Sequence, residues 1–236
     1  MNKSYKAYIF DMDGTVLDTV ADLKNAINYA FDQTGHKNDF TDEDAKRLFG
    51  SGVLVAFERG LALEAGASYD DLLLIGTDAA SVASEETKTE IAKIQEIYSS
   101  YYPLHCNDET GPYDGILEVL EELKKQGLKT AVVSNKPDLA VQKLVDLYFK
   151  GKFDFALGDR PELQRKPAAD MTNLCLEALG VSQQEAVYIG DSEIDMQTAE
   201  NAGLDCISVD WGFRPKEFLV KQGAKRIISS PKEILD

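Results

Sequence analysis

Hydrophobic and polar positions follow two different patterns along the chain. Between residues 17 and 102, apolar side chains recur at steps of three and four, which is typical of amphipathic helices. From residue 112 onward, short continuous apolar runs alternate with helical patterns, which is typical of parallel strands that are buried on both faces. One such run, Ala7–Phe10, stands alone before the helical region.

The first region contains several helix boundaries. Gly35 is placed to end a helix that begins after Asp18, and Thr41 with Asp44 forms a capping-box pattern. The expected helices are Asp18 to Gly35, Thr41 to Leu48, Val53 to Glu64, Ser68 to Ala79 and Ser84 to Tyr102, with no strand from Leu17 to Tyr102.

The second region predicts strands that alternate with helices. Asp114 can cap the first helix there, and Pro137 suits the first turn of the next one. The expected strands are Leu128–Val133, Phe153–Leu157, Ala186–Ile189, Asp205–Val209 and Lys225–Ile228, and the expected helices are Gly115–Gln126, the turns after Pro137, Ala168–Leu179, Ile194–Asn201 and a short one from Ser230.

This order of elements predicts an α/β fold: a Rossmann-like, doubly wound parallel sheet core with an inserted all-helical cap domain. The first strand precedes the helical region and the other strands follow it. We therefore expect a catalytic core of residues 1–16 and 103–236, and a cap of residues 17–102.

Composition narrows the class of partner. The formal net charge of -16 disfavours nucleic acid, which is bound through clusters of Lys and Arg. Three widely spaced cysteines predict neither a disulfide framework nor a zinc site. No apolar stretch is long enough for a membrane span or a signal peptide, so we expect a cytoplasmic protein.

Polar groups follow four of the expected strands. Because ligands bind beyond the carboxyl ends of parallel strands, we expect these groups to meet at one edge of the sheet. A turn residue or a helix cap would explain any one of them, but not all four together. The groups are Asp11 and Asp13, then Ser134, Asn135 and Lys136, then Arg165 and Lys166, then Asp191, Glu193 and Asp195.

These residue types suit phosphoryl transfer. Asp11, the first residue after the strand, can attack phosphorus, and Asp13 can protonate the leaving oxygen and later accept a proton from water. Gly14 allows the backbone to approach the phosphoryl group. Ser134 and Lys166 can hold the phosphoryl oxygens, and Lys166 can stabilise the charge of Asp11. Asp11 with Asp191 forms an oxygen-only site that favours Mg²⁺.

Four motifs carry a resemblance to a known family. DMDGTVLD, VVSNK, RKPAAD and GDSEID resemble, in order and spacing, the four motifs of the haloacid dehalogenase-like superfamily of phosphatases. The resemblance implies an aspartyl-phosphate mechanism and a cap between the first two motifs. It also implies that Asp11 is the nucleophile and Asp13 the acid/base. The magnesium ligands would be Asp11, Asp191 and the backbone carbonyl of Asp13, with Glu193 or Asp195 supporting the metal through water. The phosphate-binding residues would be Thr15, Ser134, Asn135 and Lys166.

Other stretches resemble the phosphoglycolate phosphatases of this superfamily. They include the first cap helix, GDRPELQRKPAAD and Trp211–Arg214. Two departures, Asp114 and Ala169 where proline is usual, lie at structural positions. The resemblance implies hydrolysis of a small phosphorylated metabolite, 2-phosphoglycolate, by a monomer or a homodimer.

Several alternatives share this core. A dehalogenase needs no acid at Asp13. A β-phosphoglucomutase-like mutase carries a basic or imidazole group early in the cap, where this chain has Lys24. A sugar-phosphate phosphatase or a pyrophosphatase would differ only in the cap, and a non-enzymatic binding module would have lost the nucleophile or the acid.

Specificity should come from the cap, because the core treats all phosphate monoesters alike. The break at Gly50, Ser51 and Gly52 is the expected loop that contacts the leaving group. Arg47 and Arg59 are candidates for binding a substrate carboxylate, although exposed arginines are more often simply solvated.

Overall fold

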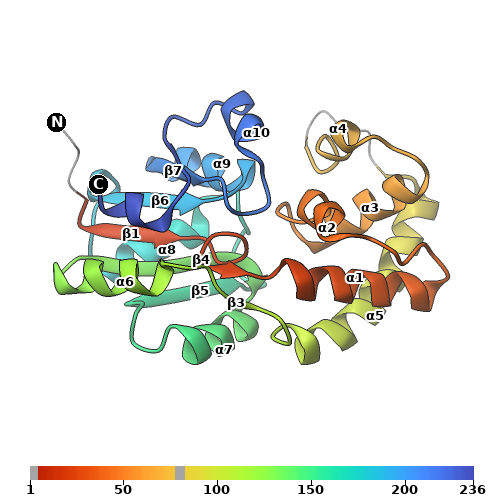
Figure 1. Cartoon of the computed structure of the whole chain (residues 1–236), viewed down its shortest axis with the longest axis horizontal. Helices are drawn as coiled ribbons and strands as arrows, with labels where there is room; N and C mark the ends of the chain where they lie inside the picture. Colours follow the sequence, from red (N-terminus) through yellow and green to blue (C-terminus); the bar gives the residue numbers. More distant parts are fainter. Residues whose placement is uncertain (1–4, 78–82) are drawn as a thin grey trace. The chain divides into compact units, whose positions relative to one another are not determined.

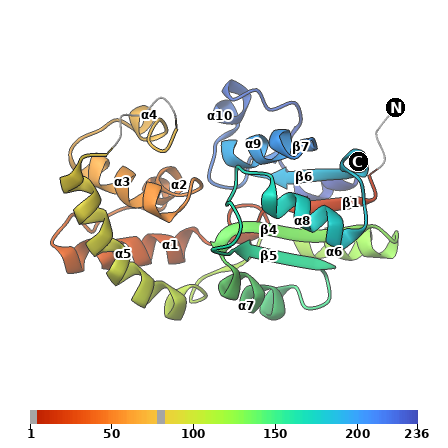
Figure 2. The same ribbon diagram turned by 180° about the vertical axis from the view of Figure 1, so that it is seen from behind.

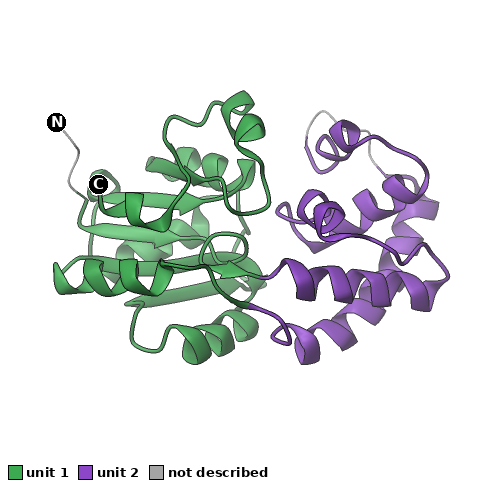
Figure 3. Ribbon diagram, in the orientation of Figure 1, with its two compact units in different colours: residues 1–18, 111–236 green, residues 19–110 purple. Residues whose placement is uncertain are grey.

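The chain folds into two compact units, shown in different colours in Figure 3. A computed structural model describes residues 5–77 and 83–236. Unit 1 comprises Met1–Asp18 and Gly111–Asp236, and unit 2 comprises Thr19–Thr110. Unit 2 therefore begins and ends later in the sequence than the cap of residues 17–102 that was expected.

Unit 1 is built on a six-stranded sheet in the order β5-β4-β1-β6-β7-β8, in which all pairings are parallel. This arrangement confirms the predicted α/β fold with a doubly wound core (Figure 1). β1 lies in the interior of the sheet although it comes first in the sequence. The strands are β1 (Ala7–Phe10), β4 (Lys129–Pro137), β5 (Phe155–Asp159), β6 (Ala186–Gly190), β7 (Asp205–Val209) and β8 (Ile227–Ile228).

Hydrophobic packing covers both faces of this sheet, which explains the continuous apolar runs of its strands. Phe10 belongs to a core cluster on one face, where helices α6 (Ile116–Lys125) and α7 (Asp138–Tyr148) pack. Ile9, the neighbouring residue of β1, belongs to the cluster on the other face with helices α8 (Asp170–Leu179) and α9 (Glu193–Asn201). Figures 1 and 2 show the two helical layers from opposite sides.

The helices of unit 1 differ from expectation in two places. Gly115, in the left-handed region at φ 91°, precedes α6, and no side chain caps that helix, so the predicted Asp114 cap is wrong. Helix α10 was not predicted because it is only six residues long. The elements are α6 (Ile116–Lys125), α7 (Asp138–Tyr148), α8 (Asp170–Leu179), α9 (Glu193–Asn201), α10 (Lys216–Lys221), and the 3-10 turns η1 (Gln183–Glu185) and η2 (Pro231–Leu235).

A two-residue strand, β2 (Leu17–Asp18), pairs antiparallel with β3 (Gly111–Pro112). The expectation that no strand follows Leu17 is therefore wrong at this point. Strands of two residues have no detectable alternation, so their sequence could not reveal them. The pairing joins the two stretches of unit 1 that lead to unit 2.

Unit 2 is helical, and the Thr41–Asp44 capping box is confirmed. The helix expected from Ser68 to Ala79 is wrong beyond its first turn, because turns follow Leu72, and its end lies outside the described residues. In the described part of the chain, no helix is both long and apolar enough to cross a membrane. The helices are α1 (Val20–Thr34), α2 (Asp42–Leu48), α3 (Val53–Glu64), α4 (Tyr69–Leu72) and α5 (Glu85–His105).

A buried carboxylate ties the first helix of unit 2 to its last segment. Asp22, in the first turn of α1, accepts hydrogen bonds from the backbone N–H groups of Glu109 and Thr110, at 3.0 Å each, and from the Thr110 hydroxyl at 2.7 Å. Its side chain is buried. These bonds hold together the two ends of unit 2, where the chain enters and leaves it.

We expect Asp22→Ala to lower the free energy of unfolding by roughly 2–4 kcal/mol, because it removes the acceptor of two backbone N–H groups and of the buried Thr110 hydroxyl. Urea denaturation followed by circular dichroism measures the change. Glu96→Ala, at an exposed position of α5, is the control and should change the stability by less than about 0.5 kcal/mol. Equal effects of the two substitutions would contradict the role of Asp22.

Candidate active site

The loop after β1 brings its backbone against a second acidic loop. The carbonyl of Met12 accepts hydrogen bonds from the N–H groups of Val16 and Leu17, which folds the loop tightly. Gly14 has φ +81°, and a Cβ atom there would lie 2.4 Å from Asp191 Oδ2. Only glycine permits both this backbone conformation and this close approach.

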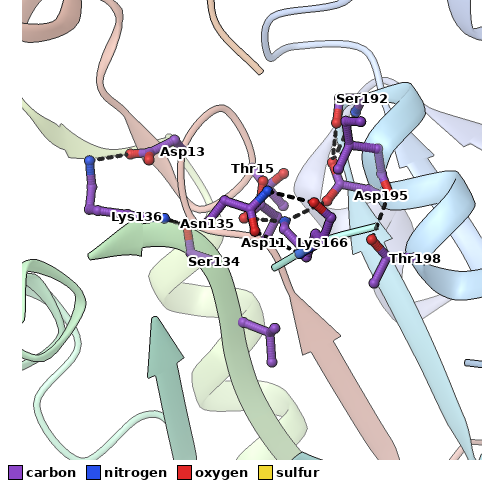
Figure 4. A network of polar contacts seen from close by, with 12 residues as sticks. Asp11, Asp13, Thr15, Ser134, Asn135, Lys136, Lys166, Ser192, Asp195 and Thr198 are labelled. Carbon is purple, nitrogen blue, oxygen red and sulfur yellow. Dashed lines mark hydrogen bonds and ion pairs between the residues drawn. The ribbon is translucent and has the colours of Figure 1, made fainter. Parts of the chain in front are cut away.

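Lys166 lies between two carboxylates at the edge of the sheet (Figure 4). Its Nζ is 2.8 Å from Asp11 Oδ1 and 2.8 Å from Asp195 Oδ1, and its side chain is only 3% exposed. The structure thus brings together Asp11 and Lys166, as the sequence predicts. It also gives Lys166 a second partner, Asp195, which was expected only to support a metal.

Asn135 fixes the backbone of Lys166. Its side-chain amide donates to the Lys166 carbonyl at 3.0 Å, and its side-chain oxygen accepts from the Lys166 N–H at 2.8 Å. Both ends of the amide are therefore engaged with one residue of a neighbouring loop. This geometry suits a positioning residue for Lys166, whereas the resemblance implied that Asn135 binds phosphate.

Three buried carboxylates crowd together here. One oxygen from each of Asp11, Asp191 and Asp195 lies within 4.8 Å of the others. Burial raises the pKa of Asp11 to about 7, with Lys166 acting in the opposite direction. Burial, Asp195 and Asp11 raise the pKa of Asp191 well above its usual value. A hard divalent cation would relieve this repulsion, so the donor set fits Mg²⁺.

Two hydrogen bonds fix the carboxylate of Asp191. Thr15 Oγ1 donates to its Oδ1 at 3.1 Å, and the backbone N–H of Phe213 donates to its Oδ2 at 2.6 Å. Thr15 was predicted to bind phosphate, and its hydroxyl here contacts the acid instead.

Asp195 is held by the first turn of its own helix as well as by Lys166. Its Oδ2 accepts from the N–H of Ser192 at 3.1 Å and from the hydroxyl of Ser192 at 2.7 Å. Both oxygens of Asp195 therefore have partners within the protein, which suits an indirect role toward a cation.

Asp13 faces away from the carboxylate cluster and toward a second lysine. Lys136 Nζ lies 3.1 Å from Asp13 Oδ1, as Figure 4 shows. The backbone N–H of Lys136 donates to Ser134 Oγ at 3.2 Å, so Ser134 and Lys136 form one local unit after Val133. Lys136 was expected at this strand end, but its sequence position alone assigns it no role.

Glu193 is paired with an arginine that the sequence analysis left without a role. Arg214 donates from Nε to Glu193 Oε2 at 2.8 Å and from Nη2 to Glu193 Oε1 at 3.1 Å. Arg214 is 1% exposed. The sequence marks Arg214 only through the family resemblance of Trp211–Arg214, and no sequence spacing links it to Glu193.

The candidate residues of unit 2 are held by local contacts. Arg47 donates to Glu43 at 2.6 Å, and its guanidinium lies 4.2 Å from the ring centroid of Tyr69. Arg59 is fully buried and donates to Ser51 Oγ at 3.0 Å. It also donates to the carbonyls of Arg47, Leu48 and Ile75. The expectation that Arg59 is an exposed arginine, either substrate-binding or solvated, is therefore wrong. Its side chain is buried, and it holds the loop of residues 50–52 through Ser51.

Comparison with known proteins places the chain among hydrolases. The family described as haloacid dehalogenase-like hydrolase matches residues 8–209. Phosphoglycolate phosphatase 1 of Pseudomonas aeruginosa is 26% identical over 228 residues, which span 96% of this chain and 77% of that protein. The phosphoglycolate phosphatase of Colwellia psychrerythraea is 28% identical over 228 residues, with 96% and 94% covered.

A solved structure from Lactobacillus delbrueckii subsp. bulgaricus, a candidate phosphoglycolate phosphatase, is 53% identical to the chain. It superposes with a TM-score of 0.95 and covers 98% of this chain and 97% of its own. The family resemblance inferred from the four motifs is confirmed. Together these matches support a phosphoric monoester hydrolase.

The raised pKa of Asp11 predicts a pH-dependent cost to stability. Between about pH 4 and pH 7 the folded protein retains a proton that the unfolded chain has released, so stability falls as pH rises through this range. In EDTA at pH 8, we expect Asp11→Asn to raise the thermal midpoint by several degrees. Each kcal/mol gained in the free energy of unfolding raises the midpoint by about 2–4 °C. Near pH 5 the gain should be small. Differential scanning calorimetry measures both.

Asp146→Asn, an exposed acid-to-amide change on α7, is the control for this substitution. It should leave the midpoint nearly unchanged at both pH values. A midpoint for Asp11→Asn that is equal to or below that of the unsubstituted protein at pH 8 would contradict the electrostatic account.

Proposed function

Because the chain belongs to the haloacid dehalogenase-like hydrolase family, we propose that it hydrolyses a small phosphate monoester through an aspartyl-phosphate intermediate. The observation that carries the proposal is the buried contact between Asp11 and Lys166, within a group of three carboxylates. Burying such a group costs folding free energy, and groups of this kind cluster at functional sites.

Asp11 is the nucleophile in this proposal. One of its carboxylate oxygens forms a bond to phosphorus while the bond from phosphorus to the leaving oxygen breaks. Lys166, already at 2.8 Å, holds the attacking carboxylate in place and stabilises negative charge on the phosphoryl oxygens. Ser134, on the neighbouring strand β4, supplies a hydroxyl that can donate to the phosphoryl oxygens.

Asp13 moves the protons. It gives a proton to the leaving oxygen in the first step, and it takes one from water in the second, when the water oxygen bonds to phosphorus and Asp11 is released. Asp13 is not part of the carboxylate cluster around Lys166, so the nucleophile and the acid/base occupy different electrostatic surroundings. Lys136 orients the Asp13 carboxylate from the far side.

Asp11, Asp191 and the backbone carbonyl of Asp13 would hold Mg²⁺, and Asp195 would act through its contact with Lys166. When bound, the cation neutralises negative charge on the carboxylates and the phosphoryl group. Thr15 and Phe213 keep Asp191 oriented for this purpose. The chain's own excess of acidic residues makes such compensation necessary for an anionic substrate.

The substrate we propose is 2-phosphoglycolate. The curated relatives described above carry the name phosphoglycolate phosphatase, and they align with nearly the whole of this chain. We further propose that unit 2 acts as the cap and that its loop Gly50–Gly52 contacts the leaving group. Arg59 keeps that loop in a fixed conformation through Ser51.

We expect the protein to release phosphate from 2-phosphoglycolate in the presence of Mg²⁺, and EDTA should abolish the release. Asp11→Asn should lower kcat by at least about 10³-fold, because it removes the nucleophile. A phosphate-release assay over 2-phosphoglycolate, sugar phosphates, nucleotides, pyrophosphate and an aryl phosphate measures substrate choice. Asp146→Asn serves as the control. Near-normal activity of Asp11→Asn would exclude Asp11 as the nucleophile.

Asp13→Asn should slow turnover and leave the first step possible for substrates with good leaving groups. An aryl phosphate supplies such a group, so rapid mixing should show a burst of aryl alcohol followed by slow phosphate release. Acid quenching should trap phosphate on the protein, and peptide mass spectrometry should locate it on Asp11. Loss of the burst together with normal steady turnover would show that Asp13 is not the acid/base.

A further inference from the structure

The segment Trp211–Arg214, which follows β7, contacts three parts of the candidate site. Trp211 donates from its indole Nε1 to the carbonyl of Thr15 at 3.1 Å. Phe213 donates from its backbone N–H to Asp191 Oδ2 at 2.6 Å. Arg214 makes the two hydrogen bonds to Glu193 described above. One short segment thus holds both the loop after β1 and the loop after β6.

Gly212 shows how closely this segment is packed. A Cβ atom at position 212 would lie 2.2 Å from the carbonyl oxygen of Gly14 and 2.4 Å from Asp191 Oδ2. Any side chain there must displace the backbone of the first loop or the carboxylate of the second. The position is therefore restricted to glycine by the site itself.

Arg214 has an electrostatic effect as well as a geometric one. Glu193 is also buried, and it lies in the first turn of α9, between Asp191 and Asp195 in the sequence. The guanidinium engages both of its oxygens, which holds that carboxylate in a fixed orientation and compensates its charge.

We propose that Trp211–Arg214 is a clasp that positions the acidic loop after β6 for cation binding, with Arg214 and Gly212 as its positioning residues. This inference rests on the proposed magnesium-dependent function and adds to it the residues that set the affinity of the site. Arg214 acts through Glu193, and Gly212 acts through Asp191. The clasp also places Trp211, the chain's single tryptophan, one residue from Gly212 and in contact with Thr15.

The test measures Mg²⁺ binding rather than turnover. Mg²⁺ is titrated into the full-length protein, and binding is followed by isothermal calorimetry and by the fluorescence of Trp211. We expect Arg214→Met to weaken Mg²⁺ binding by at least about tenfold, as is usual when a residue that orients metal ligands is lost. Arg214→Lys, which keeps the charge and loses the two-point contact, should fall between Arg214→Met and the unsubstituted protein.

Arg226→Met is the matched control. It removes the same charge from unit 1, at an exposed residue that donates to the carbonyl of Glu233. It should change the dissociation constant of Mg²⁺ by less than about twofold. Gly212→Ala is a second test that leaves every charge in place, and it should also weaken binding by at least about tenfold. Thermal midpoints confirm that each variant is folded at the temperature of the titration.

The outcomes separate this inference from the proposed function. If the unsubstituted protein binds Mg²⁺ and folded Arg214→Met and Gly212→Ala bind it equally well, the clasp has no positioning role and the inference is wrong. If Arg226→Met weakens binding as much as Arg214→Met, the effect is one of net charge and the inference is also wrong. If the unsubstituted protein neither binds Mg²⁺ nor depends on it for hydrolysis, the proposed function fails first.

Discussion

The structure of unit 1 depends on one electrostatic constraint: several carboxylates are buried at the edge of the sheet, where Lys166 contacts both Asp11 and Asp195. Lys166 keeps a raised pKa there because Asp11 and Asp195 outweigh the effect of its burial. Replacing the whole group by apolar side chains would often be neutral for stability. The group is better understood as a site whose cost to folding is offset by its use in binding and catalysis.

Hydrogen bonds from short side chains and peptide N–H groups keep this group in order. Asn135 fixes the backbone of Lys166, Ser192 fixes Asp195, and Thr15 with Phe213 fixes Asp191. Each of these partners is a short polar group or a peptide N–H with little conformational freedom, so the charged atoms are placed at small entropic cost. Preorganised groups of this kind stabilise developing charge without rearranging during the reaction.

The sequence predicted the elements whose signal is local and missed those whose signal is not. The strand Ala7–Phe10 and the helix Val53–Glu64 have the predicted bounds, because apolar runs and glycine breaks depend on neighbouring residues. The approach of Lys166 to Asp11 followed from the rule that strand ends share an edge. The pairing of Glu193 with Arg214 could not be predicted in this way, because no sequence spacing relates two residues that lie on different elements.

Burial explains why some residue types were misleading. Arginine is rarely buried completely, so Arg59 was expected at a surface, yet it is enclosed by the carbonyls at the end of α2 and by Ser51. Those carbonyls belong to the last turn of a helix, where acceptors lack partners within the helix and the macrodipole favours a cation. An arginine at this point therefore stabilises the helix end and restrains the following loop at once. Arg214 acts differently, because it engages both oxygens of Glu193 in the first turn of α9. In each unit a buried arginine therefore holds a neighbouring segment in place, and the groups proposed to act in catalysis are positioned by such contacts before the reaction begins.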